Sequence, residues 1–256
     1  MDGLSGSVAF VTGGGSGIGR ATALQLADEG CRLAIVDFRE EAARAVVSEI
    51  VAFGGDAITV LADVTRADQV ALAVDATVAA FGSLSLLVNS AGVALAEGGV
   101  ETCSEADWDT TMDVNVKGIF LTGKFAIPAL RASGGGAIVN VSSVFGVVTN
   151  LDEFAYAASK GAILNLTRQM AFQYASEGIR VNAVLPCDTD TPLISTLLRI
   201  TGDELAHAKK RLAEPIPLGR LAEAREVAAA IAFLLSSDAQ FITGVSLPVD
   251  GGFLVH

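Results

Sequence analysis

The chain has 256 residues, of which 51% are hydrophobic, and a formal net charge of −12 at pH 7. The acidic balance argues against nucleic acids and anionic membrane surfaces as partners, because both require clustered Lys and Arg. No uncharged apolar run is long enough for a membrane span, and the N-terminal residues do not resemble an export signal, so we expect a cytoplasmic protein.

Short apolar runs rich in β-branched residues alternate with stretches of helical periodicity along the whole chain. In chain order, we expect a strand at Val8–Thr12, a helix at Gly17–Glu29, a strand at Arg32–Asp37, a helix at Glu40–Phe53, a strand at Ala57–Leu61, a helix at Ala67–Phe81, a strand at Leu84–Asn89, a long helix at Glu105–Ala132, a strand at Gly136–Val141, a helix at Phe154–Ser176, a strand at Arg180–Leu185, a helix at Glu223–Ser236 and a strand at Val245–Pro248. This alternation is typical of a parallel sheet with helices on both faces. We therefore predict an α/β fold with a doubly wound, seven-stranded parallel sheet in a single domain, residues 1–256.

The segment from Pro186 to Pro217 is longer than an ordinary connection between a strand and a helix, and it carries an amphipathic stretch, Leu193–Leu212. Long insertions in compact domains are usually lids or binding loops. We predict a substrate lid at about residues 187–217, with a surface helix that has no role in binding as the alternative.

The cysteines, Cys31, Cys103 and Cys187, are odd in number and widely spaced, which fits neither a disulfide framework nor a metal site. The two histidines, His207 and His256, lie far from the other motifs. The sequence therefore favours reduced thiols and offers little for a His-based triad or a metal site.

A glycine-rich turn, Thr12–Gly19, follows the first strand and opens the first helix. Glycines in this context let the backbone approach a pyrophosphate, whose charge is favoured at a helix N-terminus. At the end of the second strand, Asp37 can accept hydrogen bonds from the ribose hydroxyls of NAD and would repel a 2′-phosphate, which favours NAD over NADP. Arg20 and Arg39 are the argument for NADP, since either can in principle reach a phosphate.

Asp63 and Val64 follow the third strand and can meet an adenine ring, with Asp63 accepting an amino proton. An Asp at a strand end that caps the following helix is an equally good interpretation of Asp63.

Tyr156 and Lys160 are four residues apart, and Ser143 lies thirteen residues before Tyr156. Residues at i and i+4 share one face of a helix, so a phenol and an ammonium are held side by side, and a nearby cation favours the ionised phenol. Ser143 can then hold a carbonyl or alcohol oxygen while a hydride moves to or from a nicotinamide. Alone, the Tyr-Lys pair is a weak signal, because most such pairs are a half-buried aromatic beside a solvated Lys.

Together, these motifs resemble those of the short-chain dehydrogenase/reductase family over almost the whole chain. The turn Thr12–Gly19 is similar to the family's TGxxxGxG turn, Asn89-Ser90-Ala91-Gly92 to its NNAG element, Asn115 to its helix Asn, Ser143 with Tyr156 and Lys160 to its catalytic group, and Arg180–Ala183 and Val249–Gly252 to its later signatures. The resemblance implies a Rossmann-type fold.

The resemblance also implies roles for four residues. Tyr156 would be the general acid/base and Ser143 would orient the substrate oxygen, while Lys160 would bind the nicotinamide ribose and lower the pKa of Tyr156. Asn115 would hold a water that links Lys160 to solvent. The spacing to Tyr156 and the alternation of side chains along a strand favour Ser143 over its neighbour Ser142.

The expected cofactor-binding residues are Gly13, Ser16, Gly17, Ile18, Gly19, Asp37, Asp63, Val64, Asn89, Ala91, Gly92, Tyr156, Lys160, Pro186, Thr189 and Thr191. Two motifs depart from the family pattern. The family's NNAG element is NSAG in this sequence, and we expect this exchange to preserve the turn and the cofactor contact of Asn89. The family's Pro-Gly pair is Pro186-Cys187. Cys187 removes easy access to positive φ and places a thiol near the nicotinamide, so it either packs, which we favour, or reacts.

The expected pocket for the substrate is mainly apolar and consists of Val93, Leu95, Ser143, Val144, Phe145, Val147, Phe154, Leu193, Ile194 and Leu197. It predicts a neutral or weakly polar secondary alcohol or ketone. The only basic run in the lid, Lys209–Arg211, is either a solvated helix face or a receptor for an anionic substrate tail.

The sequence therefore favours an NAD-dependent oxidoreductase that interconverts a secondary alcohol and a ketone. The alternatives are an NADPH-dependent 3-oxoacyl thioester reductase, which Asp37 and the acidic charge disfavour, and a catalytically silent dinucleotide sensor, which would not need the four catalytic residues together. Surplus apolar residues in Ile119–Leu130 and Ala162–Phe172, and the common state of relatives, lead us to expect a homotetramer.

Overall fold

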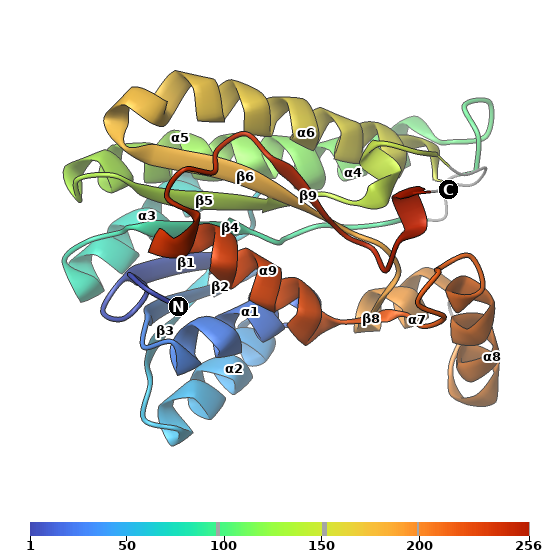
Figure 1. Cartoon of the computed structure of the whole chain (residues 1–256), viewed down its shortest axis with the longest axis horizontal. Helices are drawn as coiled ribbons and strands as arrows, with labels where there is room; N and C mark the ends of the chain where they lie inside the picture. Colours follow the sequence, from blue (N-terminus) through green and yellow to red (C-terminus); the bar gives the residue numbers. More distant parts are fainter. Residues whose placement is uncertain (96–97, 150–152, 199, 256) are drawn as a thin grey trace.

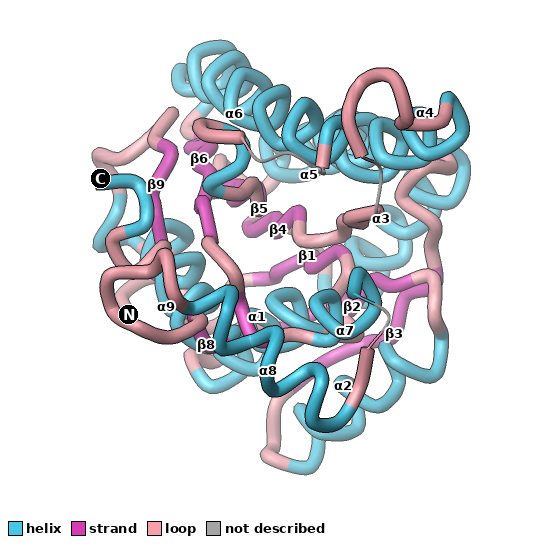
Figure 2. Tube along the Cα trace, turned by 90° about the vertical axis from the view of Figure 1, so that its right-hand side faces the viewer, coloured by secondary structure: helices cyan, strands magenta, loops and turns pink. Residues whose placement is uncertain are grey.

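The computed structural model describes residues 1–95, 98–149, 153–198 and 200–255, and for residues 196–198 it describes the backbone alone. Within these residues, seven strands form one parallel sheet in the order β3-β2-β1-β4-β5-β6-β9 (Figure 2). These strands are β1 (Val8–Thr12), β2 (Arg32–Asp37), β3 (Asp56–Leu61), β4 (Leu86–Asn89), β5 (Gly136–Val141), β6 (Ile179–Pro186) and β9 (Ser246–Val249). The predicted doubly wound α/β fold is confirmed.

Two layers of helices cover the sheet, as Figure 1 shows, with α1, α2 and α9 on one face and α3, α4, α5 and α6 on the other. The helices are α1 (Gly17–Asp28), α2 (Glu40–Ala52), α3 (Ala67–Phe81), α4 (Glu105–Met112), α5 (Gly118–Ala132), α6 (Phe154–Tyr174), α7 (Pro192–Leu198), α8 (Gly202–Ala213) and α9 (Ala224–Leu235). Short 3₁₀ turns lie at Val144–Gly146, Ala175–Glu177, Ser237–Ala239 and Phe253–Val255. No helix among the described residues is long and apolar enough to cross a bilayer.

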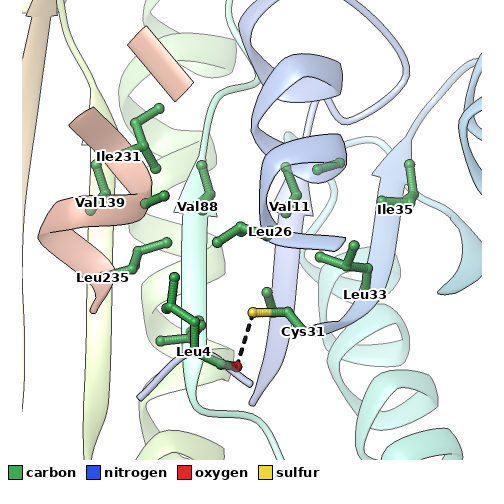
Figure 3. Packing of buried hydrophobic residues seen from close by; sticks show 14 of the residues in the cluster. Leu4, Val11, Leu26, Cys31, Leu33, Ile35, Val88, Val139, Ile231 and Leu235 are labelled. Carbon is green, nitrogen blue, oxygen red and sulfur yellow. Dashed lines mark hydrogen bonds between the residues drawn. The ribbon is translucent and has the colours of Figure 1, made fainter. Parts of the chain in front are cut away.

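Side chains of β1 alternate between two buried clusters because successive residues of a strand face opposite sides of the sheet. Ala9 and Val11 belong to the cluster under α1 and α9, whereas Val8 and Phe10 belong to the cluster on the other face. Figure 3 shows Val11 beside Leu26 of α1. A strand buried on both faces must be apolar throughout, which explains the continuous apolar runs of the sequence.

Cys31 is one of the residues that close this core at the start of β2 (Figure 3). Its Sγ donates a hydrogen bond to the carbonyl oxygen of Leu4 at 3.2 Å, and burial raises the pKa of the thiol to about 12. This cysteine is therefore a neutral packing residue.

The structure differs from the sequence-based expectation in the long helix expected at Glu105–Ala132. A π-helical turn, Asp113–Lys117, separates α4 from α5. At Gly118, a side chain would begin 3.0 Å from Cγ2 of Val64, so the start of α5 packs closely against the loop that follows β3. Periodicity alone did not reveal this turn, which interrupts the α-helical hydrogen bonding over only five residues.

The lid region also has more structure than the sequence indicated. The single amphipathic segment expected at Leu193–Leu212 is two helices, α7 and α8, which lie together at one end of the molecule (Figure 1). A small parallel ribbon of β7 (Thr189–Asp190) and β8 (Ala222–Glu223) joins the two ends of this region. The ribbon ties the ends of the insertion together, so the insertion begins and ends beside the main sheet.

Candidate active site

A cleft of about 740 Å³ lies at the carboxyl ends of the central strands, where the strand order changes direction. The switch occurs at β1, whose Thr12 is aligned with Val36 of β2 on one side and Asn89 of β4 on the other. Chains leave the two sides of such a point toward opposite faces of the sheet, so a crevice opens between them. Most of the residues expected to bind a cofactor or a substrate line this crevice.

The glycine-rich turn forms one wall of the cleft. Gly13 has φ of 62°, and a Cβ there would lie 2.9 Å from the backbone nitrogen of Ala91. At Gly19, a Cβ would collide with the carbonyl group of Gly13. The N-terminus of α1 reaches the cleft through Ser16, Gly17 and Ile18, and it can hold a pyrophosphate there. Gly19 does not line the cleft.

Thr12 fixes the opposite side of this turn. Its Oγ1 accepts hydrogen bonds from the backbone N–H groups of Ser90 and Ala91, at 3.1 and 3.2 Å. Ser90, Ala91 and Gly92 therefore enter the cleft in a defined conformation, and all three line it. This role of Thr12 depends on residues 78 and 79 positions away, so the sequence motif alone did not indicate it.

Asp37 ends β2 at the far end of the cleft and is 4% exposed. Its Oδ2 accepts from Gly15 N at 3.1 Å, and its Oδ1 accepts from the Arg39 backbone N at 3.0 Å and from Arg39 Nε at 3.2 Å. Arg39 also donates from Nη2 to Ser16 Oγ at 2.8 Å. A carboxylate and a guanidinium thus stand together where a ribose next to the adenine is expected.

Asp63 and Val64 also line the cleft. Oδ1 of Asp63 accepts from the backbone N of Thr65 at 2.9 Å and from its Oγ1 at 2.8 Å. The residue that caps α3 is Arg66, so Asp63 shapes the loop before the helix and does not cap it.

Asn89 takes a different place from the expected one, behind the cleft lining. Its Oδ1 accepts from Thr122 Oγ1 at 2.7 Å, and its Nδ2 donates to Asn140 Oδ1 at 2.8 Å. The amide oxygen is therefore bonded to α5 and the amide nitrogen to β5. Asn89 braces the strand that carries Ala91 and Gly92 to the cleft.

Ser143, Tyr156 and Lys160 meet at the other end of the cleft, and all three line it. Ser143 follows β5, and its side chain is hydrogen-bonded to the phenol of Tyr156. Lys160 lies one turn after Tyr156 on α6, with Nζ 5.3 Å from the centroid of the phenol ring, and Nζ donates to Val141 O at 3.0 Å. Ser142 instead donates from Oγ to the carbonyl oxygen of Lys160 at 2.8 Å.

The electrostatics of this group differ from the sequence-based expectation. Desolvation raises the pKa of Tyr156 above its ordinary value, and the negative charges of Glu153 and Asp188 raise it further, while the hydrogen bond from Ser143 lowers it. Desolvation lowers the pKa of Lys160 to about 8. Burial thus disfavours both charged forms, and the net shift of the phenol is upward; the expected lowering of its pKa by Lys160 stays a prediction.

Asn115 lies on the π-helical turn and is 1% exposed. Its Oδ1 accepts from Val93 N at 2.8 Å, and its Nδ2 donates to Val93 O at 2.9 Å and to Ser159 Oγ at 3.0 Å. A Cβ on Gly92 would lie 3.3 Å from Asn115 Oδ1 and 3.6 Å from Lys160 Nζ, so the amide and the amine converge on Gly92. Asn115 does not line the cleft itself, but its amide holds the backbone of Val93, which does. π turns often occur at functional sites.

Comparison with known proteins agrees with this geometry. Residues 13–254 match a family model described as enoyl-(acyl carrier protein) reductase, adh_short_C2. This protein belongs to the short-chain dehydrogenase/reductase family. It is 40% identical to the 2,5-dichloro-2,5-cyclohexadiene-1,4-diol dehydrogenase of Sphingobium indicum, with 98% of each chain covered, and 39% identical to the cyclohexanol dehydrogenase of an Acinetobacter species, with 98% of this chain and 96% of the relative covered.

Among solved structures, the 3-ketoacyl-(acyl-carrier-protein) reductase of Brucella melitensis complexed with NADH superposes with a TM-score of 0.90 at 35% identity, and the match covers 98% of this chain and 99% of the other. As a short-chain dehydrogenase/reductase, the protein is an oxidoreductase that uses a nicotinamide dinucleotide on alcohol or ketone groups. The cradle at Gly13, the N-terminus of α1 and the polar end at Asp37 fit such a cofactor.

Pro186, Thr189 and Thr191 of this short-chain dehydrogenase/reductase line the same cleft as Ser143, Tyr156 and Lys160. Thr189 donates from Oγ1 to Cys187 O at 2.9 Å, which holds the turn after β6. Cys187 also lines the cleft, packs against Val144 in a small buried cluster, and has a thiol pKa raised to about 11 by burial. A neutral, packed thiol agrees with the packing interpretation.

The substrate end of the cleft contains Val93, Phe145, Leu193 and Ile194, as expected. Leu95 and Phe154 are not part of the lining, and the side chain of Leu197 lies outside the described residues. Phe154 opens α6 and is 40% exposed, with its ring centroid 5.7 Å from that of Trp108, so the start of the helix directs this ring to α4 and away from the cleft.

Asp113, which is paired with Lys117, lines the cleft although the sequence did not indicate it, and so do the two acidic side chains whose charges act on Tyr156, Glu153 and Asp188. Signals for both existed: Glu153 stands three residues before Tyr156, a spacing that faces the same side of a helix, and Asp188 follows the strand end at Pro186. The basic run of the lid, by contrast, is not in the described lining, and Lys209 forms an ion pair with Asp190 at 2.6 Å.

Proposed function

We propose that this enzyme is an NAD-dependent dehydrogenase that interconverts neutral secondary alcohols and ketones. The observation that carries the proposal is the hydrogen-bonded pair of Ser143 and Tyr156, at the apolar end of a cleft whose other end holds Asp37. One end thus offers a proton-transferring phenol, and the other offers a carboxylate for a ribose.

For the cofactor, Asp37 supports NAD over NADP. Its carboxylate can accept hydrogen bonds from both hydroxyls of a ribose, whereas a 2′-phosphate would meet a like charge. Arg39, the side chain best placed to bind such a phosphate, is already paired with Asp37 and Ser16. Ser16, Gly17 and the N-terminus of α1 would hold the pyrophosphate, and Asp63, Val64, Ala91, Gly92, Pro186, Thr189 and Thr191 would line the rest of the cofactor.

For catalysis, the bound nicotinamide supplies the hydride acceptor or donor. Ser143 holds the substrate oxygen, and Tyr156 takes the hydroxyl proton during oxidation and returns it during reduction. Lys160, with a pKa of about 8, can give and take a proton near neutral pH and is placed to continue the relay behind the phenol. We propose Asn115 as a positioning residue for the Gly92–Val93 backbone beside Lys160; its role in holding a water stays a prediction.

For the substrate, the walls formed by Val93, Phe145, Leu193 and Ile194 favour a compact apolar body around the reacting carbon. Relatives named for a cyclohexadienediol and for cyclohexanol share about two-fifths of the residues. These observations together support cyclic secondary alcohols as the substrate class.

The second candidate is a 3-oxoacyl thioester reductase, which the solved structure with a TM-score of 0.90 favours. Asp37 and the acidic substrate end count against NADPH and against a long, phosphate-bearing substrate. A silent dinucleotide sensor is disfavoured because Ser143 and Tyr156 are hydrogen-bonded in the cleft together with Lys160.

The experiment is a panel of cyclic and acyclic secondary alcohols and one 3-oxoacyl thioester, each with both cofactors, followed by the absorbance of reduced nicotinamide. We expect turnover of cyclohexanol-type alcohols with NAD. Turnover of the thioester with NADPH alone would replace the first candidate with the second, and no turnover of any substrate would favour the sensor.

We also propose that the enzyme is a cytoplasmic homotetramer. Phe120 on α5 and Phe172 on α6 are 55% and 88% exposed, which is unusual for large aromatic side chains and supports a subunit interface on this face. Light scattering after size-exclusion chromatography measures the assembly directly, and a monomer mass would refute it.

A further inference from the structure

Two carboxylates stand at the substrate end of the cleft. Glu153 immediately precedes α6, three residues before Tyr156, and Asp188 lies in the turn between β6 and β7. They come from parts of the chain that are distant in sequence, yet both line the same cleft as the Tyr156 phenol.

Both carboxylates act on the phenol that is proposed to exchange the proton. The negative charges of Glu153 and Asp188 each raise the pKa of Tyr156, so both fields reach the phenol. Asp188 is half-buried, and desolvation raises its own pKa. Charges in such a poorly hydrated place interact more strongly than surface charges, because little water separates them.

Among the described residues that line the cleft, no basic side chain is placed to neutralise the charges of Glu153 and Asp188 when a substrate binds. The two basic residues there are Arg39, which is paired with Asp37 at the opposite end, and Lys160, which is 5% exposed and donates to Val141 O. Lys209 of the lid is paired with Asp190. Four apolar side chains, Val93, Phe145, Leu193 and Ile194, line the same end beside Ser143 and Tyr156.

We infer that Glu153 and Asp188 determine substrate charge: they make the pocket select uncharged alcohols that carry a second hydroxyl and reject alcohols that carry a carboxylate. This inference rests on the proposed function. An ionised carboxyl accepts hydrogen bonds, so a second hydroxyl on the substrate finds a charge-assisted partner. A substrate carboxylate brought to the same place meets like charges in an apolar pocket.

The test compares three substrates of similar size: cyclohexanol, 1,4-cyclohexanediol and 4-hydroxycyclohexanecarboxylate. For the wild type, we expect kcat/KM for the carboxylate to fall at least about tenfold below that for the diol, as like charges in a weakly screened site require. Glu153→Gln and Asp188→Asn should each narrow this gap by about fivefold, chiefly through KM for the carboxylate, and the double variant should narrow it further.

A matched control is Glu177→Gln, which removes the same charge from a surface residue paired with Arg131, and it should leave the ratio unchanged. Because the cleft variants can fail to fold, the wild type is also tested with cyclohexanecarboxylate and cyclohexanemethanol as competitive inhibitors. Inhibition by the carboxylate should be at least about tenfold weaker.

The outcomes separate this inference from the proposed function. Two results refute the charge selection and leave the proposed dehydrogenase activity standing. In the first, the wild type oxidises cyclohexanol but has equal kcat/KM for the diol and the carboxylate. In the second, the difference in kcat/KM is unchanged in active Glu153→Gln and Asp188→Asn variants. If no alcohol is oxidised with either cofactor, the proposed function fails, and calorimetric titration of the protein with cyclohexanecarboxylate and cyclohexanemethanol then tests the charge selection directly: equal affinities for the two would refute it.

Discussion

Lys160 lies one helical turn from Tyr156, with its Nζ 5.3 Å from the centroid of the phenol ring, and it donates a hydrogen bond to Val141 O. The amine is therefore held between the end of β5 and the ring. Desolvation lowers its pKa to about 8, whereas the pKa of Tyr156 is raised. In the protein alone, the amine and not the phenol is the group of this pair that titrates near neutral pH.

Replacing Tyr156 with Phe removes the hydroxyl that exchanges the proton and keeps the ring that lies beside Lys160. We expect kcat to fall by roughly a thousandfold, in the range of general acid/base catalysis, while the dissociation constant for the cofactor changes little. Steady-state kinetics and fluorescence titration with NADH measure the two quantities.

The control is Tyr174→Phe, which alters the only other tyrosine, at the far end of α6. This variant should retain near wild-type turnover. A Tyr156→Phe enzyme with turnover close to that of the control would remove Tyr156 from the mechanism.

Glu153→Gln should shift the pH profile of alcohol oxidation. The groups that face the phenol are Glu153, Asp188, Ser143 and Lys160. Oxidation needs the phenolate to accept a proton, so kcat/KM rises with pH through an apparent pKa. Because the Glu153 charge raises the pKa of Tyr156, its removal lowers that pKa, and the rising limb should move to lower pH.

The profile is measured as kcat/KM for cyclohexanol, a neutral substrate, so that the direct effect of charge on binding is small. Glu177→Gln should superimpose on the wild type. A shift to higher pH would contradict the assigned influence of Glu153, and an unmoved limb would show that its charge does not reach the phenol.

Asp37→Ser should widen cofactor use from NAD to NADP. The substitution removes the carboxylate that would repel a 2′-phosphate and releases Arg39, which Asp37 now holds through Nε at 3.2 Å. We expect the ratio of kcat/KM for NADP to that for NAD to rise by about a hundredfold, because a repulsion is replaced by an attraction.

Arg39→Ala in the Asp37→Ser background tests the cause. If the freed guanidinium binds the phosphate, the second substitution should abolish most of the gain. A gain that persists without Arg39 would mean that repulsion by Asp37 alone sets the preference.

The fold was largely predictable from the sequence because β1 and its neighbours are buried on both faces and leave continuous apolar runs. Val8–Thr12 and Gly136–Val141 begin and end as expected. The interruption at Asp113–Lys117 was not predicted, since a π turn of only five residues between two α-helices is too short to stand out in a helical pattern.

The candidate site was predictable where a motif has a local backbone requirement, as at Gly13, and less so where residues meet only in space. Asn89 was expected in the cleft, yet its partners, Thr122 and Asn140, place it behind the lining. The pKa of Tyr156 was expected to fall because the sequence shows Lys160 but not the burial around both groups.

The amide of Asn140 should be essential for stability, because it connects four elements through buried hydrogen bonds. Its Oδ1 accepts from Asn89 of β4 at 2.8 Å, and its Nδ2 donates to Thr167 of α6 at 2.9 Å. Asn89 in turn accepts from Thr122 of α5. Asn140→Ala leaves the Asn89 amide and the Thr167 hydroxyl with fewer partners in a site closed to water, and we expect a loss of about 2 to 4 kcal/mol in the free energy of unfolding.

Asn165→Ala is the matched control, since Asn165 is exposed on the same helix that carries Thr167, and its loss should stay within about 0.5 kcal/mol. Urea unfolding at a fixed protein concentration gives both values, provided that the slope of the transition is the same in each variant. An equal loss in the two variants would mean that the asparagine network contributes no more than an average surface amide, and that β4 and β5 are held in register by their backbone and apolar contacts alone.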